Sequence, residues 1–346
     1  MTKSWSPQGH KPDTTDLEMA FEDNRLASQL YGEYDQNLAL IEQKLGVRAN
    51  PRGNHVMVSG SAIAVDQARR TLESLYSQLE EGQNITVGDV DGIIRMILTD
   101  DSQLTLPTIE KKRGHVRMAQ IATRKATIVA RSPAQDGYIR AMDRTELVFG
   151  VGPAGTGKTY LAVAYAATLL ERGDINRIIL SRPAVEAGEH LGFLPGDMKE
   201  KVDPYLRPLY DALYDMMQPE IVDRCIEQNT IEVAPLAFMR GRTLSNAVII
   251  LDEAQNTTTQ QMKMFLTRLG ENSKMIVTGD PSQIDLPRGV KSGLIEALDF
   301  LSGVEGIHMT RFSDKDVVRH ELVARIIRAY DKKADAETKA DKSKAE

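Results

Sequence analysis

The sequence contains one cysteine, one tryptophan and few aromatic side chains of any kind, which make up 5% of its 346 residues. A lone Cys225 can neither form an intrachain disulfide nor supply the paired cysteines of a zinc site, which favours a reducing compartment. No apolar run reaches the roughly 18 residues that span a bilayer, and the polar N-terminal stretch lacks the apolar core of a signal peptide. We therefore expect a cytoplasmic protein without a membrane segment.

Basic side chains are also in deficit, with 43 Lys and Arg against 49 Asp and Glu, which gives a formal charge of −6. That average is not typical of a protein that coats nucleic acid over its whole surface. The charge is sorted along the chain, however, because residues 111–131 contain seven bases and no acid, which leaves −13 for the rest. This segment predicts either a solvated linker between domains or a strip that contacts nucleic-acid phosphates.

The chain is long enough for two domains, each with its own apolar core. Between two polar tails, the N-terminal part predicts a small α+β module. Its expected elements are a strand at 17–22, one helix with apolar positions from Leu26 to Leu45, a strand pair around 47–58, and helices over 61–80 and 87–98. We divide the chain into a disordered tail (1–16), this module (17–100), a basic linker (101–132), a larger domain (133–330) and a second disordered tail (331–346).

The larger domain shows short apolar segments that alternate with helical ones from Thr145 onward. This alternation is typical of a parallel sheet covered by helices on both faces, the α/β class. A helix is expected at 160–171, and strands are expected at 146–151, 177–181, 231–233, 247–251, 274–278 and 306–310.

Residues 152–159 read GPAGTGKT and fit the G-x-x-x-x-G-K-[ST] phosphate loop, between an expected strand and an expected helix. Glycines let successive backbone N–H groups point at a polyphosphate, and the helix that begins there adds its positive end. Lys158 would reach the β and γ phosphates of ATP, and the Thr159 hydroxyl would ligate Mg²⁺. The expected nucleotide-binding residues here are Gly152, Pro153, Ala154, Gly155, Thr156, Gly157, Lys158, Thr159 and Tyr160.

Two carboxylates end the apolar strand that closes at Leu251. Asp252 would hold the Mg²⁺ shell, and Glu253 would orient and deprotonate a water for attack on the γ phosphate. The alternative is a pair of carboxylates that cap a helix beginning near Thr257. A kinase would not need a water-activating glutamate here, so the pair favours hydrolysis.

Other polar residues have less specific patterns. Gln283 follows the strand at 274–278 and would contact the γ phosphate or the attacking water, although Asp280-Pro281 alone predicts a plain β-turn.

Upstream of the loop, Gln135 would read the adenine edge and Tyr138 would stack on the base, unless both are surface filler. A Gly-punctuated loop after 177–181 predicts either a single-stranded nucleic-acid contact or a subunit contact, and it contains Arg182, Glu186, Glu189 and His190.

Taken together, GPAGTGKT, VIILDEAQN and TGDPSQIDLP resemble the PhoH-like ATPase family, a branch close to the motor core of superfamily-1 helicases. SRPAVEAGEHLGFLPGD and FSDKDVVRHELV are also similar to that family's segments, so the resemblance covers most of 145–330. It implies a RecA-like P-loop fold in which Lys158 and Thr159 bind ATP and Mg²⁺, with Gln283 as the γ-phosphate sensor. It also implies Asp252 and Glu253 as the acidic box and Gln135 as the adenine-reading glutamine.

The module at the N-terminus is similar to a KH-like RNA-binding domain in its element order, although a GxxG loop is not evident. Full helicases place an arginine from a second ATPase domain against the γ phosphate, where it can be worth about 10³–10⁵ in rate. We expect this chain to obtain that arginine from a neighbour in a homo-oligomeric ring, by resemblance a hexamer. The candidates, each of which could instead form a structural salt bridge, are Arg311, Arg319, Arg182 and Arg288.

The sequence thus predicts an ATP hydrolase coupled to RNA binding or remodelling, extending to RNA helicase activity. By resemblance, it would act in ribosomal RNA processing beside a YbeY-type endoribonuclease. The alternative is a scaffold that binds RNA or assembles partners, is switched by ATP, and does not unwind.

Overall fold

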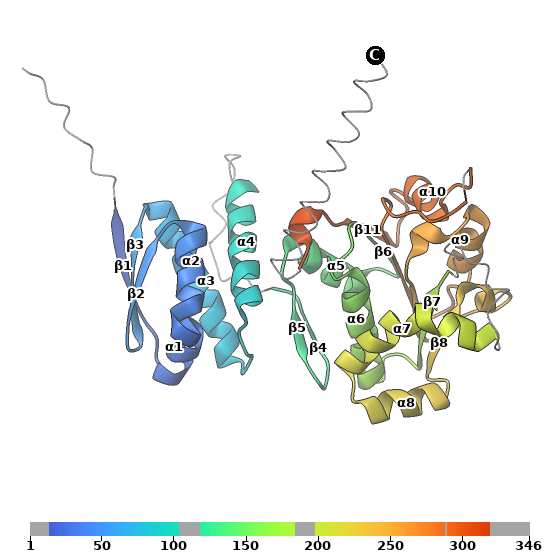
Figure 1. Cartoon of the computed structure of the whole chain (residues 1–346), viewed down its shortest axis with the longest axis horizontal. Coiled ribbons are helices and arrows are strands. Elements are labelled where there is room, and N and C mark those ends of the chain that lie inside the picture. The colour runs from blue at the N-terminus through green and yellow to red at the C-terminus, as the bar shows by residue number, and fades with distance from the viewer. Residues whose placement is uncertain (1–13, 104–117, 184–197, 288, 319–346) are drawn as a thin grey trace, which may run out of the picture.

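The computed structural model describes residues 14–103, 118–183, 198–287 and 289–318. They form an N-terminal module and a larger α/β part that lie side by side (Figure 1). Helix α4 (Val87–Gln103) lies on the side of the module that faces the larger part. None of the helices in the described ranges is long and apolar enough to cross a membrane.

The N-terminal module has the element order strand-helix-helix-strand-strand-helix, and its strands and its third helix lie close to where the sequence predicts them. Its sheet is antiparallel, with the order β1-β3-β2, so β2 is an edge strand. Ser61 caps the third helix, because its hydroxyl accepts a hydrogen bond from the Ala64 N–H. The elements are β1 (Thr15–Ala20), α1 (Asn24–Tyr31), α2 (Gln36–Leu45), β2 (Arg48–Arg52), β3 (His55–Gly60) and α3 (Ala62–Glu80).

One expectation for the module is wrong: the single helix that ends at Leu45 is two helices. The chain turns between α1 and α2, where Gly32, Tyr34 and Asp35 all have positive φ angles of 79°, 53° and 58°. A helix cannot continue through such residues, because its hydrogen-bond ladder requires negative φ throughout.

Residues 118–131 are not a solvated linker. They form a hairpin of β4 (Gln120–Ala122) and β5 (Thr127–Val129), which buries Met118 and Ile121 and packs on the larger part. Two of its basic side chains bind the protein itself, since Lys125 donates to the Tyr214 carbonyl and Arg131 pairs with Asp89. The strip is therefore not a continuous phosphate-binding surface in this half, and its remaining bases, apart from Arg124, lie outside the described residues.

The larger part is built on a six-stranded sheet in the order β11-β6-β10-β9-β7-β8, and all of its strand pairs are parallel. This confirms the predicted α/β class, and each predicted strand is found within two residues of its expected ends. The strands are β6 (Leu147–Val151), β7 (Arg177–Arg182), β8 (Ile231–Pro235), β9 (Ala247–Leu251), β10 (Lys274–Gly279) and β11 (Ile307–Arg311).

Helices cover both faces of this sheet. The strand β9 is buried along its whole length, and its side chains point alternately into two apolar clusters. One cluster contains Val248 and Ile250 and continues through α6 into the N-terminal module, while the other contains Ile249 and Leu251. The helices are α5 (Pro133–Arg144), α6 (Lys158–Arg172), α7 (Met198–Met216), α8 (Pro219–Glu227), α9 (Thr259–Leu266) and α10 (Gly293–Phe300), with short 3-10 turns η3 (Leu236–Met239), η4 (Ala254–Asn256) and η5 (Asp314–Asp316).

Candidate nucleotide-binding site

The phosphate loop joins the end of β6 to the start of α6, as the sequence predicts. Its glycines Gly152, Gly155 and Gly157 have positive φ angles of 148°, 83° and 82°. At Gly152 a side chain is also excluded by space, since a Cβ would lie 2.5 Å from the Phe312 carbonyl oxygen. The loop therefore needs glycine for its backbone path, which frees its N–H groups to face a ligand.

Lys158 lies under this loop, with 8% of its surface exposed. Its Nζ donates to the carbonyls of Gly152 at 2.7 Å and Pro153 at 2.8 Å, while the Thr156 hydroxyl also donates to Pro153 at 3.0 Å. The ammonium is thus held within the loop by backbone oxygens, at the place where phosphate charge would be neutralised.

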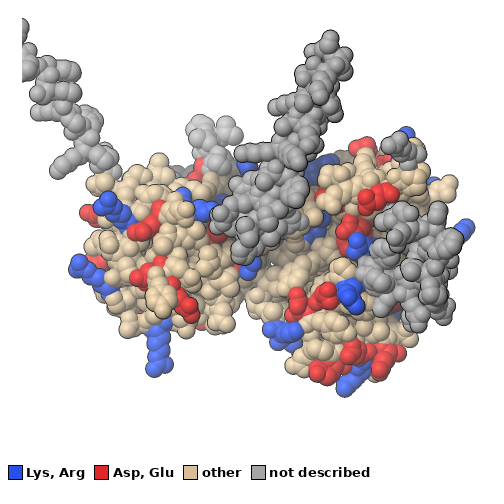
Figure 2. Space-filling model, viewed as in Figure 1, with Lys and Arg blue, Asp and Glu red and all other residues tan. Residues whose placement is uncertain are grey.

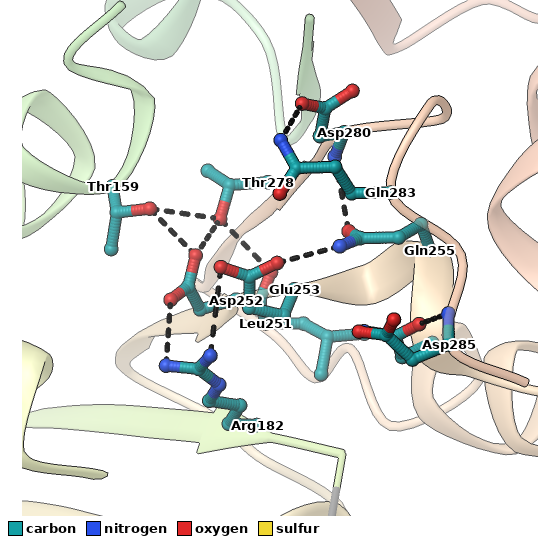
Figure 3. Close-up of polar contacts among 11 residues, drawn as sticks. Thr159, Arg182, Leu251, Asp252, Glu253, Gln255, Thr278, Asp280, Gln283 and Asp285 are labelled. Atoms are coloured by element: carbon teal, nitrogen blue, oxygen red, sulfur yellow. Dashed lines mark hydrogen bonds and ion pairs between the residues drawn. The ribbon is translucent and has the colours of Figure 1, made fainter. Parts of the chain in front are cut away.

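The Thr159 hydroxyl, in the first turn of α6, meets the Asp252 carboxylate at the end of β9 (Figure 3). The hydroxyl donates to Asp252 Oδ1 at 2.6 Å, and the Thr278 hydroxyl donates to the same oxygen at 2.7 Å. Hydroxyl and carboxylate oxygens suit Mg²⁺, which completes its shell with water and substrate phosphates. In the described parts of the chain no three His, Cys, Asp or Glu side chains cluster as metal ligands, so a site dominated by protein ligands finds no support there.

Glu253 follows directly and adopts left-handed backbone angles, φ 52° and ψ 39°. Such angles are unfavourable for a residue with a Cβ and are found at functional sites. Gln255 holds the side chain in place, because its Nε2 donates to Glu253 Oε2 at 2.6 Å while its Oε1 accepts from the Asp280 N–H at 3.0 Å. The two carboxylates do not cap the following helix, since Thr258 and Gln261 form the capping box of α9.

Gln283 lies in a turn after β10, and its Nε2 donates to Asp280 Oδ2 at 2.6 Å. Burial would raise the pKa of Asp280, but hydrogen bonds from Ser282 and Gln283 and the nearby Lys158 charge together lower it. The turn that the sequence also predicts is real, and it leaves Gln283 on the wall of a hollow of about 240 Å³. Lys158 and Glu253 line the same hollow, together with Ala154, Gly155, Gly157, Thr159, Tyr160, Asp252, Gly279 and Asp280.

Arg182 lies in its own chain's acidic box, at the end of β7. Its guanidinium is 4.0 Å from Asp252 Oδ2 and 3.6 Å from Glu253 Oε1. Arg311 is exposed at the end of β11. The other candidate fingers, Arg319 and Arg288, lie outside the described residues, as do Glu186, Glu189 and His190.

Tyr138 does not face the site, so its predicted stacking on a base is wrong. Its side chain is 0% exposed, its ring packs edge-on against Phe312 at 5.4 Å, and burial raises its pKa strongly. Its apolar neighbours on α5, Ile139 and Met142, are buried too. Together these three residues belong to the buried side of α5.

Gln135 is also buried and supports the loop from behind. Its Nε2 donates to the Thr156 carbonyl at 3.0 Å, and its Oε1 accepts from the Arg131 N–H at 2.7 Å. Its reading of an adenine edge stays a prediction. The sequence analysis assigned no role to Thr278 and Gln255, although both lie within its motifs TGDPSQIDLP and VIILDEAQN.

The sequence is similar to known proteins of one family. Residues 127–331 match the family model described as PhoH-like protein. The chain is 52% identical over 306 residues to the PhoH-like protein of Bacillus subtilis (strain 168), covering 88% of this chain and 94% of that one. It is 48% identical over 311 residues to Protein PhoH of Escherichia coli (strain K12), covering 89% and 79%. A solved Sulfolobus solfataricus SWI2/SNF2 ATPase core in complex with dsDNA matches at 15% identity and a TM-score of 0.35, covering 58% of this chain and 48% of that one, which is too weak to support an argument.

Proposed function

The chain belongs to the PhoH-like protein family, and we propose that it hydrolyses ATP and couples the hydrolysis to RNA binding or remodelling. One observation carries the first half of the proposal. The fold brings Lys158, Thr159, Asp252 and Glu253 from two separate motifs to the walls of one hollow at the carboxyl edge of the sheet.

Each side chain has a definite task in this reaction. Lys158 and the loop N–H groups would neutralise the β and γ phosphates, which carry the charge of the transition state. Mg²⁺ held by Thr159 and Asp252 would add further charge stabilisation when bound. Glu253, fixed by Gln255, would take the proton of the attacking water, and Gln283 would contact the γ phosphate from the opposite wall.

Hydrolysis is tested by phosphate release from ATP and Mg²⁺ with no second substrate present. The wild-type chain should release phosphate, and Lys158→Ala should abolish it. Lys263→Ala, a change of the same kind on the exposed side of α9, should not alter the rate. Phosphate release that persists in Lys158→Ala would contradict the proposal.

The RNA half of the proposal is supported by the N-terminal module, whose strand and helix order is similar to that of a KH-like domain. Its edge strand β2 exposes Arg48 and Arg52 on the same side, where phosphates could be met. We expect RNA to stimulate ATP hydrolysis, with stimulation that falls steeply as salt rises. Replacing both arginines by Ala should reduce the stimulation, whereas Arg224→Ala on α8 should not. Stimulation that is flat with salt would argue against RNA as the partner.

The second candidate, a scaffold that is switched by ATP without unwinding, has its own support. The loop between the first two helices carries Glu33 and Asp35, which repel phosphates, and Lys125 and Arg131 are engaged by the protein itself. On the face shown in Figure 2, Lys and Arg are interspersed with Asp and Glu over both parts rather than gathered in one patch. RNA-stimulated hydrolysis without strand displacement would favour this candidate; displacement that vanishes in Glu253→Gln would favour a motor.

A homo-oligomeric ring, by family resemblance a hexamer, and a YbeY-type endoribonuclease partner in ribosomal RNA processing belong to the same proposal. Of the two described finger candidates, Arg182 lies against the acidic box of its own chain and Arg311 is exposed at the end of β11, so we assign the finger to Arg311. Mixing Arg311→Ala chains with Lys158→Ala chains should restore activity. The site of an Arg311→Ala chain still has Lys158, and it can receive Arg311 from a neighbouring Lys158→Ala chain. Sedimentation of a monomer with full activity would contradict the ring.

A further inference from the structure

A second, larger hollow of about 990 Å³ lies between the N-terminal module and the larger part. Gly155, Gly157 and Tyr160 line both this hollow and the smaller one of about 240 Å³. The two hollows therefore adjoin at the phosphate loop and the first turn of α6. The opposite wall of the larger hollow includes the turn after α3, with Gly82 and Asn84.

A whole nucleotide requires the volume of both hollows together. Small-molecule sites in proteins usually measure about 300–1,000 Å³, so the smaller hollow is too small for more than the phosphates and the larger one is at the upper end of the range. A nucleoside joined to phosphates in the loop must extend from the small hollow past the start of α6. Tyr160, which is 39% exposed, lies at this point and lines both hollows.

Arg131 forms part of the larger hollow's wall, and its position is fixed by both parts of the molecule. Its Nε is 3.3 Å from Asp89 Oδ1 of α4, and its backbone N–H is bound by Gln135. Two glycines on one side of α4 allow this contact, since a Cβ at Gly88 would lie 3.3 Å from Arg131 Cζ and one at Gly92 would lie 3.0 Å from its Cα. The guanidinium is thus placed beside the phosphate loop by the N-terminal module.

The segment after β11 makes a further connection between module and loop. Arg95 of α4 donates to the Lys315 carbonyl at 2.7 Å, and the Val318 N–H donates to the Gly155 carbonyl of the phosphate loop at 2.9 Å. Residues 315–318 therefore contact both α4 and the loop. A ligand between them would meet walls whose relative position is already defined.

We propose that the larger hollow is the nucleoside subsite, in which the base and ribose contact Tyr160 and Arg131 on one side and the turn at residues 82–86 on the other. This rests on the proposed function, since it requires ATP phosphates in the loop. It assigns part of the nucleotide site to the N-terminal module, which neither the motifs nor the family resemblance does. Nucleotide binding would then add contacts between the module and the larger part.

The test compares ATP with inorganic tripolyphosphate, which has the phosphates and no nucleoside. Asn84→Trp would fill the hollow from an exposed position for which no hydrogen bond is seen in the structure. Titration calorimetry with Mg²⁺ present should show ATP binding weakened about tenfold or more and tripolyphosphate binding unchanged. The matched control is Asn50→Trp, on the exposed side of β2 and outside the hollow, which should bind both ligands as the wild type does.

Two results would overturn the subsite: ATP binding as tight in Asn84→Trp as in Asn50→Trp, or an equal loss for both ligands. Failure of the proposed function looks different, because Lys158→Ala would then leave the binding of both ligands intact.

A second measurement uses the unaltered chain and does not depend on how a variant folds. Hydrogen exchange of the backbone amides of residues 82–86 should slow when ATP is added and stay unchanged with tripolyphosphate. Equal protection by both ligands, or by neither, would contradict the subsite.

Discussion

The carboxyl edge of the large sheet and helix α3 of the module use their polar side chains differently. At the carboxyl edge of the large sheet, Asp252 is 5% exposed, Gln255 1% and Thr278 0%, and these side chains bond to one another or to their neighbours. On helix α3 of the module, the half-buried Arg69 pairs instead with Asp66 and Glu73 at helical spacing, and the buried Arg70 pairs with Asp101 of α4. Burying polar groups costs free energy that surface pairs do not cost. The buried network is therefore best explained by the chemistry it serves, and the module's stability rests on its apolar core.

The largest expected effect on stability lies in the module. Leu72→Ala empties a fully buried position on α3 and should lower the free energy of unfolding by about 2–5 kcal/mol. Leu98→Ala, at a position on α4 that is 40% exposed, should cost far less. Urea unfolding measures both, and calorimetry should show tripolyphosphate binding unchanged. Equal costs for the two variants would show that the module is not held by this core.

At the buried network we expect a large loss of hydrolysis and little loss of stability. Asp252→Asn keeps the shape of the side chain and removes the charge that holds Mg²⁺, so hydrolysis should fall about 10²-fold or more. The free energy of unfolding should change by less than about 1 kcal/mol, because the amide oxygen can still accept hydrogen bonds from Thr159 and Thr278. Phosphate release and urea unfolding give the two values. A large loss of stability with little loss of rate would show that the buried network serves stability rather than hydrolysis.

A smaller effect is expected at Gln255, and it distinguishes the positioning of Glu253 from the binding of ATP. Gln255→Ala leaves Glu253 Oε2 and the Asp280 N–H without a partner, which should cost about 1–3 kcal/mol. We expect kcat to fall about tenfold with KM for ATP unchanged, since Gln255 acts through Glu253. Gln260→Ala, on the exposed start of α9, is the control. A rise in KM alone would show that Gln255 serves ATP binding instead.

The smallest effect concerns a surface pair of the large part, Glu232 and Arg242, whose atoms lie 2.6 Å apart. The Arg242 hydrogen bond lowers the pKa of Glu232 below its ordinary 4.5. The pair therefore contributes stability above that ordinary value and loses it as the pH falls through the lowered one. Relative to Glu232→Gln, the wild type should gain under about 1 kcal/mol at pH 7 and nothing in strong acid. A constant difference across this range would show that charge plays no part.

Much of the sheet and of the phosphate site could be predicted from the sequence because their signals are local. Apolar strand segments bounded by polar ones, and glycines at positive φ before Lys158, depend on neighbours in the chain. Tyr138 could not be placed this way, since its burial depends on Gly150, where a Cβ would lie 2.8 Å from its ring, and on Phe312 far along the chain.

The break at Tyr34 and Asp35 and the hairpin at 118–131 were missed for different reasons. Residues with a Cβ seldom adopt positive φ, so the turn between the first two helices has only Gly32 as a local signal. For the hairpin, seven bases dominate residues 111–131, and the apolar Met118 and Ile121 that pack it against the larger part are scattered among them, so the local composition is that of an exposed segment.

The central claim is that the buried network performs hydrolysis, and Glu253→Gln tests it most directly. This change keeps the size of the side chain and removes the base. Calorimetry should show ATP bound as tightly as by the wild type, while phosphate release in a single turnover falls about 10²–10⁴-fold. A variant that binds ATP and hydrolyses it at the wild-type rate would contradict the account.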